Sequence, residues 1–419
     1  SLVEKVVVWQ RGTSGVPLTA EREVDFYALC QSQPVTCPAE MVGSEDPLFL
    51  LYTLGSTGTP RGCLYAHGGY MVGTAYYTWL AFDLKEDDIY WCMSDIGWIV
   101  GHSTLVYGPW ANGTTVLIRE GSPDYPKQDT VWSIIEKYRV TKLFTAPTAI
   151  RMFMKFGPQY PAAHDLSSLR AIICAGEPLN AEALVWAREH IGRGKVAIGD
   201  NWWQTETGSP TIGTLPCMEV RAGRVGKPLP GYSTKVVDFN GQPVQPHQGG
   251  LLVMEGAWPQ MVRTLWRDRE RYLDYWRIVP PYYTAGDVAT VDEDGYIAVL
   301  GRADDVMNVA GHRIGTADVE NALLSHPTVA EAAVIGKPDP LKGEAIKAFV
   351  ILKLGQVSSD ELKEQMVEHV RHELGPIATP SELEFVAILP KNRAGKIMRR
   401  VLKARELGID PGDLTTIEA

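Results

Sequence analysis

Apolar and polar positions in the middle of the chain alternate in a way that predicts strands separated by helices. Between residue 48 and about residue 200, short apolar runs are interspersed with longer segments of helical periodicity. The apolar runs are 113–118, 140–145 and 169–174, and the helical segments between them are 130–138 and 147–156. Strands and helices that alternate at this spacing favour a mainly parallel sheet covered by helices.

The pattern changes after residue 215. Up to residue 300, short apolar runs are separated by dipeptides typical of tight turns, at Asn240-Gly241, Gly249-Gly250 and Asp294-Gly295. Such pairs supply the backbone conformations that two-residue hairpin turns need. This region is therefore predicted to be antiparallel β structure.

A third region begins near Gly301. We expect a helix from Thr316, as its cap, through Leu324, then strands near 329–335 and 346–352. A second helix, over 359–374 and capped by Ser358 or Ser359, has one apolar face. That face consists of Leu362, Met366, Val370 and Leu374. Together these elements predict a compact α+β unit, preceded by a polar hinge over 301–305.

The predicted fold is therefore α/β plus α+β. Residues 1–214 form the α/β part of a large domain, residues 215–303 a β-rich subdomain of it, and residues 304–419 a small α+β domain. A short apolar strand over 6–9 begins abruptly, and the first residue is Ser1 rather than Met. We therefore expect the large domain to be truncated at its N-terminus.

Composition narrows the class of protein. The chain has 419 residues, of which 45% are hydrophobic and 21% charged, as in a globular protein with a large core. No apolar run approaches the roughly 18 residues of a membrane span, and the net charge of −10 argues against nucleic acid as a partner. We expect a cytoplasmic protein, with an organellar matrix open because a targeting signal could precede Ser1. Six scattered cysteines without a CxxC pair indicate reduced thiols.

The stretch 52–62 is the most informative local motif. Its three glycines, three threonines and one serine follow the apolar run 48–51. Such a loop can wrap backbone N–H groups and hydroxyls around phosphate oxygens. It is not a Walker A loop, because it continues as Thr59-Pro60-Arg61-Gly62 instead of Gly-Lys-Ser/Thr. Taken alone, a flexible surface loop explains it equally well.

Further polar segments follow predicted strands or lie in loops. They are 175–178, 200–208, 283–287, 301–313 and 390–400. Each has an ordinary structural explanation: Asp287 as a turn residue, Lys396 as solvated surface, Arg302 and Arg313 in weak ion pairs, and Glu206 as a helix cap. It is their combination and order that favour a function.

In that order, the segments resemble the adenylate-forming superfamily of acyl-CoA synthetases, and within it the acetyl-CoA and propionyl-CoA synthetases. The resemblance covers essentially the whole chain. It implies a large N-terminal domain, truncated here, and a small mobile C-terminal domain. It implies a ligase that joins a short carboxylic acid to ATP, giving acyl-adenylate and pyrophosphate, and then to coenzyme A with release of AMP. ATP, Mg²⁺ and coenzyme A are the implied small-molecule partners.

The resemblance also implies roles for individual residues. Lys396 would orient the carboxylate against the α-phosphate, Thr205 and Arg313 would contact that phosphate, and Glu206 would be associated with Mg²⁺. Asp287, with Arg302 nearby, would bind the ribose. The other implied nucleotide-binding residues are Gly55, Ser56, Thr57, Gly58, Gly176, Glu177, Pro178, Asp200, Asn201, Trp202 and Gln204.

Acyl specificity is assigned by the same resemblance. Trp203 would close the acyl pocket, which Ile99, Val100 and Ala175 would line; as an alternative, Trp203 is simply one of two core tryptophans. Acetyl-type enzymes tend to have threonine in place of Val100 and valine in place of Ala175. The wider pocket favours propionate over acetate, with a hydroxylated C2–C3 acid left open.

The C-terminal domain of such enzymes rotates between the two half-reactions. Asp304 would be the hinge, and Ala310, Gly311 and Arg371 would contact coenzyme A, although Arg371 also fits a solvated helix face. The motif around Lys396 implies regulation by a lysine acetyltransferase and deacetylase. Neutralising that ammonium would disable adenylation.

Some positions depart from the family pattern. Leu54 replaces a usual serine, Thr59 a frequent lysine and Arg61 a usual lysine. We expect these changes to affect the rate of adenylation rather than ATP binding, and the chain as given to adenylate poorly without an upstream segment. Two alternatives stay open: a module that loads a carrier protein, and a nucleotide-binding domain with impaired catalysis.

Overall fold

A computed structural model describes most of the chain. It covers residues 3–11, 15, 17–19, 21–54, 60–177, 179–303, 307–310, 312–391, 397–411 and 414, with only the backbone of residues 54, 60, 308, 312 and 313. Two compact units are present, 1–43 and 44–419. Over the described parts of the chain, no helix has both the length and the apolar character needed to cross a membrane.

The first unit is small. Strand β1 (Val6–Val8) pairs in parallel with β2 (Glu23–Asp25), which leads directly into helix α1 (Phe26–Gln31). Asp25 caps this helix by accepting a hydrogen bond from the N–H of Ala28 at 2.9 Å. The apolar strand expected near residue 8 is therefore present.

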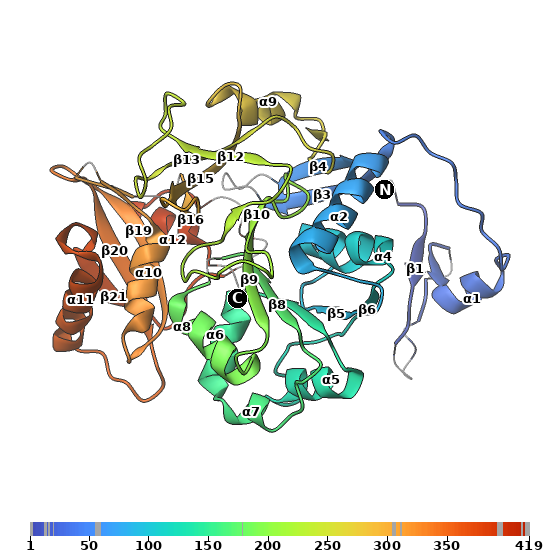
Figure 1. Cartoon of the computed structure of the whole chain (residues 1–419), viewed down its shortest axis with the longest axis horizontal. Coiled ribbons are helices and arrows are strands. Elements are labelled where there is room, and N and C mark those ends of the chain that lie inside the picture. Colours follow the sequence, from blue (N-terminus) through green and yellow to red (C-terminus); the bar gives the residue numbers. More distant parts are fainter. Residues whose placement is uncertain are drawn as a thin grey trace. The chain divides into compact units, whose positions relative to one another are not determined.

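A seven-stranded sheet forms the centre of the second unit (Figure 1). Five strands run in parallel, as the sequence predicted, and two short antiparallel strands extend one edge. In spatial order they are β11 (Lys227–Pro228), β10 (Ile212–Gly213), β9 (Ala197–Trp202), β8 (Ala171–Ala175), β7 (Lys142–Thr145), β5 (Ile89–Cys92) and β6 (Thr115–Leu117).

Helices cover both faces of this sheet because successive strand residues point to opposite sides. Ile172 and Ile198 pack against α5 (Thr130–Tyr138), α6 (Pro147–Phe156) and α8 (Ala181–Trp186). On the other face, Ile173 packs with residues of α2 (His67–Phe82). The remaining helical turns are α3 (Ile99–Gly101), η1 (His102–Tyr107), α4 (Gly108–Ala111), α7 (Gln159–Ala162) and η2 (Ala187–Ile191).

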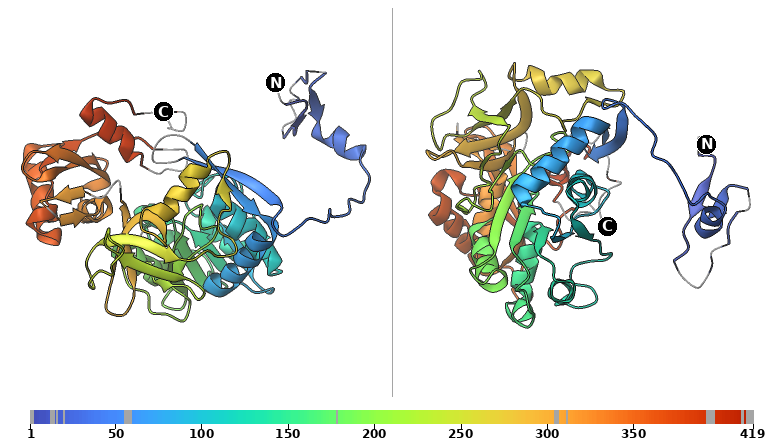
Figure 2. Two further views of the ribbon diagram at one scale, coloured as in Figure 1. Left: turned by 90° about the horizontal axis from the view of Figure 1, so that it is seen from above. Right: turned by 45° about the vertical axis from the view of Figure 1, so that its right-hand side comes forward.

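Two antiparallel sheets complete the large domain. One has the order β12 (Ser233–Val237), β13 (Gly250–Glu255), β15 (Tyr283–Val291) and β16 (Ile297–Arg302), in agreement with the predicted antiparallel region. The other joins β3 (Pro47–Leu54), β4 (Pro60–Ala66) and β14 (Thr264–Leu265). Helix α9 (Arg269–Arg277) contacts β14 and β15 and lies beside this second sheet (Figures 1 and 2).

The core around these sheets is rich in aromatic residues. Tyr65, Tyr70 and Tyr283 are almost completely buried there, together with Trp258 and Met261. The phenol of Tyr70 shares a hydrogen bond with the hydroxyl of Ser103. Burial raises the pKa of each of these three tyrosines well above its ordinary value.

The C-terminal region from Met307 is an α+β unit with its own core. Its elements are β17 (Met307–Val309), β18 (His312–Ile314), α10 (Thr316–Ser325), β19 (Val329–Asp339), β20 (Gly343–Leu352), α11 (Asp360–Leu374), η3 (Pro376–Ala378), β21 (Glu382–Phe385) and α12 (Arg399–Leu407). Helices α10 and α11 pack on one face of the β19–β20 hairpin, and α12 packs on the other. Ser359 caps α11, as predicted. Gly315, rather than Thr316, is the residue before α10.

Candidate nucleotide and acyl site

The glycine-rich loop connects two antiparallel strands. Strand β3 ends at Leu54, β4 begins at Pro60, and the register pairs these two residues. Gly55, Ser56, Thr57 and Gly58 lie outside the described residues. The sequence indicated a strand that enters a loop; the hairpin partner β4 was not predicted, because the short run after Pro60 gave no separate strand signal.

The parallel strands β8 and β9 end side by side, and the polar segments 175–178 and 200–208 lie at these two ends. Ala175 at the end of β8 pairs with Asn201 in β9. Gly176 follows with φ of 100°, a conformation that glycine adopts without strain, and a side chain there would meet open space. Glu177 accepts hydrogen bonds from Arg151 at 2.9 Å and from Thr148, and Pro178 lies outside the described residues.

Asp200 lies at the base of this edge and is only 2% exposed. One carboxyl oxygen accepts the N–H of Leu179 at 3.1 Å and the other accepts the N–H of Asn201 at 2.9 Å. Burial outweighs these hydrogen bonds and raises the pKa of Asp200 to about 8. The side-chain amide of Asn201 is also buried, with no hydrogen-bond partner for either atom among the described residues. Such unsatisfied groups are unusual in folded proteins and often mark functional sites.

Gln204 connects the segment after β9 to the segment in β15. Its amide nitrogen donates to the carbonyl of Ala285 and to Oδ2 of Asp287, both at 2.7 Å, and its amide oxygen accepts from the phenol of Tyr283 at 2.9 Å. Asp287 is buried, and in the β15–β16 register it lies opposite Arg302, whose guanidinium is 3.9 Å away. Three of the predicted nucleotide-binding residues therefore come together: Gln204, Asp287 and Arg302.

Thr205 and Glu206 follow at the end of the same segment. The phenol of Tyr65 donates to the carbonyl of Thr205, which fixes the backbone there. One carboxylate oxygen of Glu206 accepts from the phenol of Tyr275 at 2.5 Å and lies 3.6 Å from Nη1 of Arg61. Arg61 also donates to the phenol of Tyr275 at 2.6 Å.

One of these residues, Glu206, suits the binding of a magnesium ion. Wherever the structure describes side chains, no three His, Cys, Asp or Glu residues form a group that could hold a metal ion. Mg²⁺ is commonly bound through one or two carboxylates together with substrate phosphates. Glu206 lies beside Arg61 of β4, the strand that follows the phosphate loop. It could serve as that single carboxylate.

The four predicted acyl-pocket residues share two hydrophobic clusters. Val100 and Trp203 pack against both clusters, Ile99 is buried in one and Ala175 in the other. The indole of Trp203 is therefore placed between the β-rich part and the central sheet.

The predicted residues of the C-terminal domain are less completely described. Asp304, Gly311 and Lys396 lie outside the described residues, and for Arg313 only the backbone, in β18, is described. Ala310 has φ of 50° and donates its N–H to the carbonyl of Lys342 at 2.7 Å. Arg371 is exposed on α11.

Sequence reasoning missed the partners of the predicted residues. Tyr65, Tyr275, Tyr283, Thr148 and Arg151 all bond to them, and none belongs to a recognisable motif. Tyr275 is separated from Glu206 by 69 residues, so no local spacing could have linked them.

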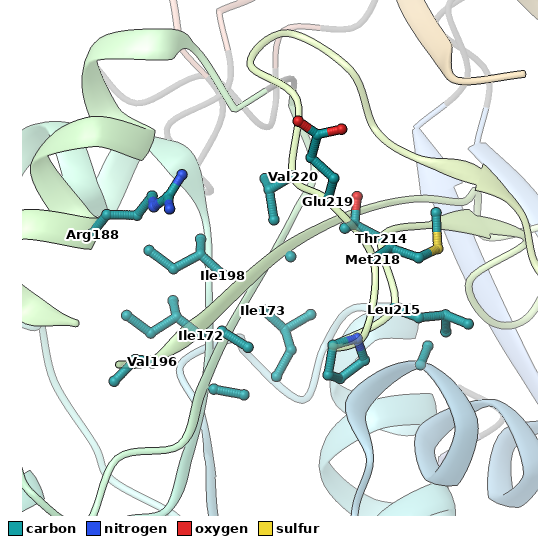
Figure 3. Close-up of a pocket in the computed structure, with 15 residues that line it drawn as sticks. Ile172, Ile173, Arg188, Val196, Ile198, Thr214, Leu215, Met218, Glu219 and Val220 are labelled. Atoms are coloured by element: carbon teal, nitrogen blue, oxygen red, sulfur yellow. The ribbon is translucent and has the colours of Figure 1, made fainter. Parts of the chain in front are cut away.

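A pocket of about 310 Å³ lies elsewhere along β8 and β9 (Figure 3). Isoleucines of both strands form its floor, and Arg188 and Glu219 lie at its sides. It contains none of the predicted site residues. The candidate nucleotide-binding residues are therefore identified by their hydrogen-bonded side chains and not by this pocket.

Comparison with known proteins identifies the family and the fold. The family model described as AMP-binding enzyme matches residues 4–266, and the model described as AMP-binding enzyme C-terminal domain matches residues 318–396. The solved structure of an anthranilate CoA ligase in complex with anthranoyl-AMP superposes with a TM-score of 0.83 and 31% identity, covering 97% of this chain and 74% of that one. The fold is that of adenylate-forming enzymes.

Curated relatives give the same result. The acetyl-coenzyme A synthetase of Methanothrix thermoacetophila is 51% identical over 99% of this chain, and that of Pyrobaculum aerophilum is 50% identical over 99%. The chain spans 64% and 63% of the length of these two relatives. The chain belongs to the AMP-binding enzyme family.

Proposed function

We propose that the protein containing this chain is a short-chain acyl-CoA synthetase of the AMP-forming type. It converts a carboxylic acid, propionate or acetate, and ATP to an acyl-adenylate and pyrophosphate. It then transfers the acyl group to coenzyme A and releases AMP. The observation that carries the proposal is about 50% identity, over 99% of the chain, to proteins named acetyl-coenzyme A synthetase.

The described residues suit the first half-reaction. A carboxylate oxygen attacks the α-phosphorus, and the bond from that phosphorus to the pyrophosphate oxygen breaks. Asp287, oriented by Gln204, would bind the ribose hydroxyls, and Asp200 with the Gly176 turn would accommodate the base. When bound, Mg²⁺ would offset the charge of the phosphates, with Glu206 as its protein ligand. Lys396 and Arg313 would supply the remaining positive charge.

In the second half-reaction, the thiol sulfur of coenzyme A attacks the acyl carbon. The bond from that carbon to the AMP oxygen breaks, and the thiol proton is released. We assign the passage of coenzyme A to Ala310 and Gly311, contact with its phosphates to Arg371, and the intervening domain rotation to Asp304. The positive φ of Ala310 places a small side chain at a tight turn beside Gly311.

We propose propionate as the preferred acid. Val100 and Ala175 both pack on the cluster that also contacts Trp203, and alanine leaves more space than valine at that position. One methylene group in an apolar pocket changes discrimination by about 1–3 kcal/mol.

We further propose a cytoplasmic location and control by reversible acetylation of Lys396. Acetylation removes the positive charge that the first half-reaction requires. Protein acetylated at Lys396 should therefore lose pyrophosphate exchange. Retention of the full exchange rate would contradict this part of the proposal.

Acid-dependent exchange of pyrophosphate into ATP tests the main proposal. The assay is run on the protein containing this chain with acetate, propionate, butyrate and 3-hydroxypropionate. We expect exchange with all short acids, greatest with propionate, and thioester formation with free coenzyme A. Exchange that requires no acid, or thioester formation only with a carrier protein, would overturn it.

A further inference from the structure

A partly buried hydrogen-bonded array connects three distant segments beside the candidate phosphate site. Its members are Arg61 in β4, Glu206 after β9 and Tyr275 in α9. The side chains of Arg61 and Glu206 are each only 12% exposed. The phenol oxygen of Tyr275 lies between them, 2.6 Å from Nη1 of Arg61 and 2.5 Å from Oε1 of Glu206.

The chemistry of the three groups fixes the direction of the hydrogen bonds. A guanidinium group can only donate, so the phenol oxygen of Tyr275 must accept from Arg61. Its single proton is then directed to Glu206.

This arrangement distinguishes the two oxygens of Glu206. Oε1 receives the phenol proton and faces the Arg61 charge. Within the described part of the chain, Oε2 takes part in no hydrogen bond or ion pair. A carboxylate held rigidly through one oxygen presents the other in a defined direction, which is how groups around a metal ligand raise its affinity.

We propose that Tyr275 is a positioning residue for the divalent cation of the reaction. Its hydroxyl holds Oε1 of Glu206 so that Oε2 is the oxygen that binds Mg²⁺, and it keeps Arg61 from neutralising both oxygens. This inference rests on the proposed function, which supplies the substrate as ATP with Mg²⁺. It concerns Tyr275, a residue that no sequence motif indicates.

The rest of the side chain of Tyr275 supports a phenylalanine substitution as a test. Its ring packs against Tyr283 with a centroid distance of 5.4 Å, in a cluster that also contains Trp276. Phenylalanine retains these contacts and removes only the hydroxyl. Tyr272, on the same helix and packed on the same cluster, forms no side-chain hydrogen bond among the described residues, so Tyr272→Phe is a matched control.

The decisive measurement is the equilibrium affinity for ATP by calorimetry, in excess Mg²⁺ and in excess EDTA. We expect Tyr275→Phe to reduce the gain in ATP affinity due to Mg²⁺ by about tenfold, as loss of a group that orients a metal ligand usually does. Affinity in EDTA should change less than about threefold, and Tyr272→Phe should behave as wild type. In a Glu206→Gln background, Tyr275→Phe should cause no further loss.

Three results would overturn the inference: an unchanged Mg²⁺ effect in Tyr275→Phe, an equal loss with and without Mg²⁺, or no Mg²⁺ effect in the wild type. If Tyr275→Phe does not fold, Tyr275→Met replaces it, because methionine also fills apolar space without a hydroxyl. Failure of the proposed function is recognised separately, as absence of acid-dependent pyrophosphate exchange in a wild type whose ATP affinity still depends on Mg²⁺.

Discussion

At the scale of single residues, Asp200 shows how strongly burial can oppose hydrogen bonding. The carboxyl group accepts two backbone hydrogen bonds, which favour the ionised form, yet its pKa is about 8 because it is almost completely removed from water. An aspartic acid that stays protonated near neutral pH makes the stability of the fold sensitive to pH.

This pKa predicts a direction for that sensitivity. The folded-state value, about 8, lies above the ordinary 3.8, so the stability due to the bound proton is present below pH 3.8 and is lost as the pH rises through 8. Relative to Asp200→Asn, which has no such proton, wild type should lose about 1 kcal/mol of unfolding free energy per pH unit in this range. Denaturant unfolding at several pH values measures it; parallel pH profiles of the two proteins would contradict the prediction.

Trp203 gives a second prediction at this scale. Its indole packs on two clusters that also contain Ile99, Val100 and Ala175. If it closes the acyl pocket, Trp203→Gly should shift specificity toward longer acids, with hexanoate gaining at least about tenfold relative to propionate, since each buried methylene contributes about 0.8 kcal/mol. Pyrophosphate exchange across an acid series measures this shift.

The control for that experiment is Trp110→Gly, because Trp110 is 58% exposed and lies outside both clusters. It should leave the acid preference unchanged. A Trp203→Gly protein that is less stable but has the same preference would show that the indole is only a core residue.

The sequence identified residues with chemistry but not their partners. Gln204, Asp287 and Glu206 were expected at the site from their order along the chain. The tyrosines that orient them come from other elements and carry no motif, because a phenol in a core looks like any other aromatic residue until its neighbours are known.

At the scale of elements, the described residues on the two sides of the Lys396 segment pair with each other. Lys391 and Ile397 form an antiparallel bridge, and the N–H of Met398 donates to the carbonyl of Pro390 at 2.8 Å. Arg399, the first residue of α12, contacts both carboxylate oxygens of the buried Glu320 in α10, at 2.8 and 2.5 Å. One of these oxygens also accepts the N–H of Val334.

Breaking the ion pair between Arg399 and Glu320 should destabilise the contact of α12 with α10. Arg399→Met leaves the carboxylate of Glu320 without its bidentate partner, and we expect a loss of about 2–3 kcal/mol of unfolding free energy. Adding Glu320→Gln should restore part of this loss, because the amide can still accept from Val334 and carries no charge. Denaturant unfolding of the two variants tests this, and a double variant less stable than Arg399→Met would contradict it.

Periodicity predicted the elements better than their pairing. Strands β6, β7 and β8 and the helices α10 and α11 were expected near their observed bounds, whereas no bounds were expected for β5 and β9. The β3–β4 hairpin and the addition of β14 to it were not, since β14 pairs with a strand about two hundred residues earlier in the chain. Long-range pairing depends on the packing of whole faces, which a local pattern does not contain.

At the scale of the whole molecule, the large and small domains have separate hydrophobic cores. Among the described residues, buried side chains from Met307 onward form two clusters that contain no residue of the central sheet. Domains with separate cores are expected to unfold separately. Calorimetry should therefore show at least two transitions.

Ligand binding should distinguish these transitions. ATP with Mg²⁺ at 100 times its dissociation constant should stabilise the domain that binds it by about 2.7 kcal/mol. If the described nucleotide residues form the site, the transition of the large domain moves most. A single cooperative transition that ATP shifts as a whole would contradict separate unfolding.

The tyrosine-rich interior has one more consequence. Burial raises the pKa of a set of phenols far above their ordinary value: Tyr65, Tyr70, Tyr90, Tyr232, Tyr275 and Tyr283. Under alkaline conditions these groups cannot form phenolate until water enters the interior. The ultraviolet absorbance of phenolate therefore serves as an intrinsic optical reporter of core hydration, without any added dye or label.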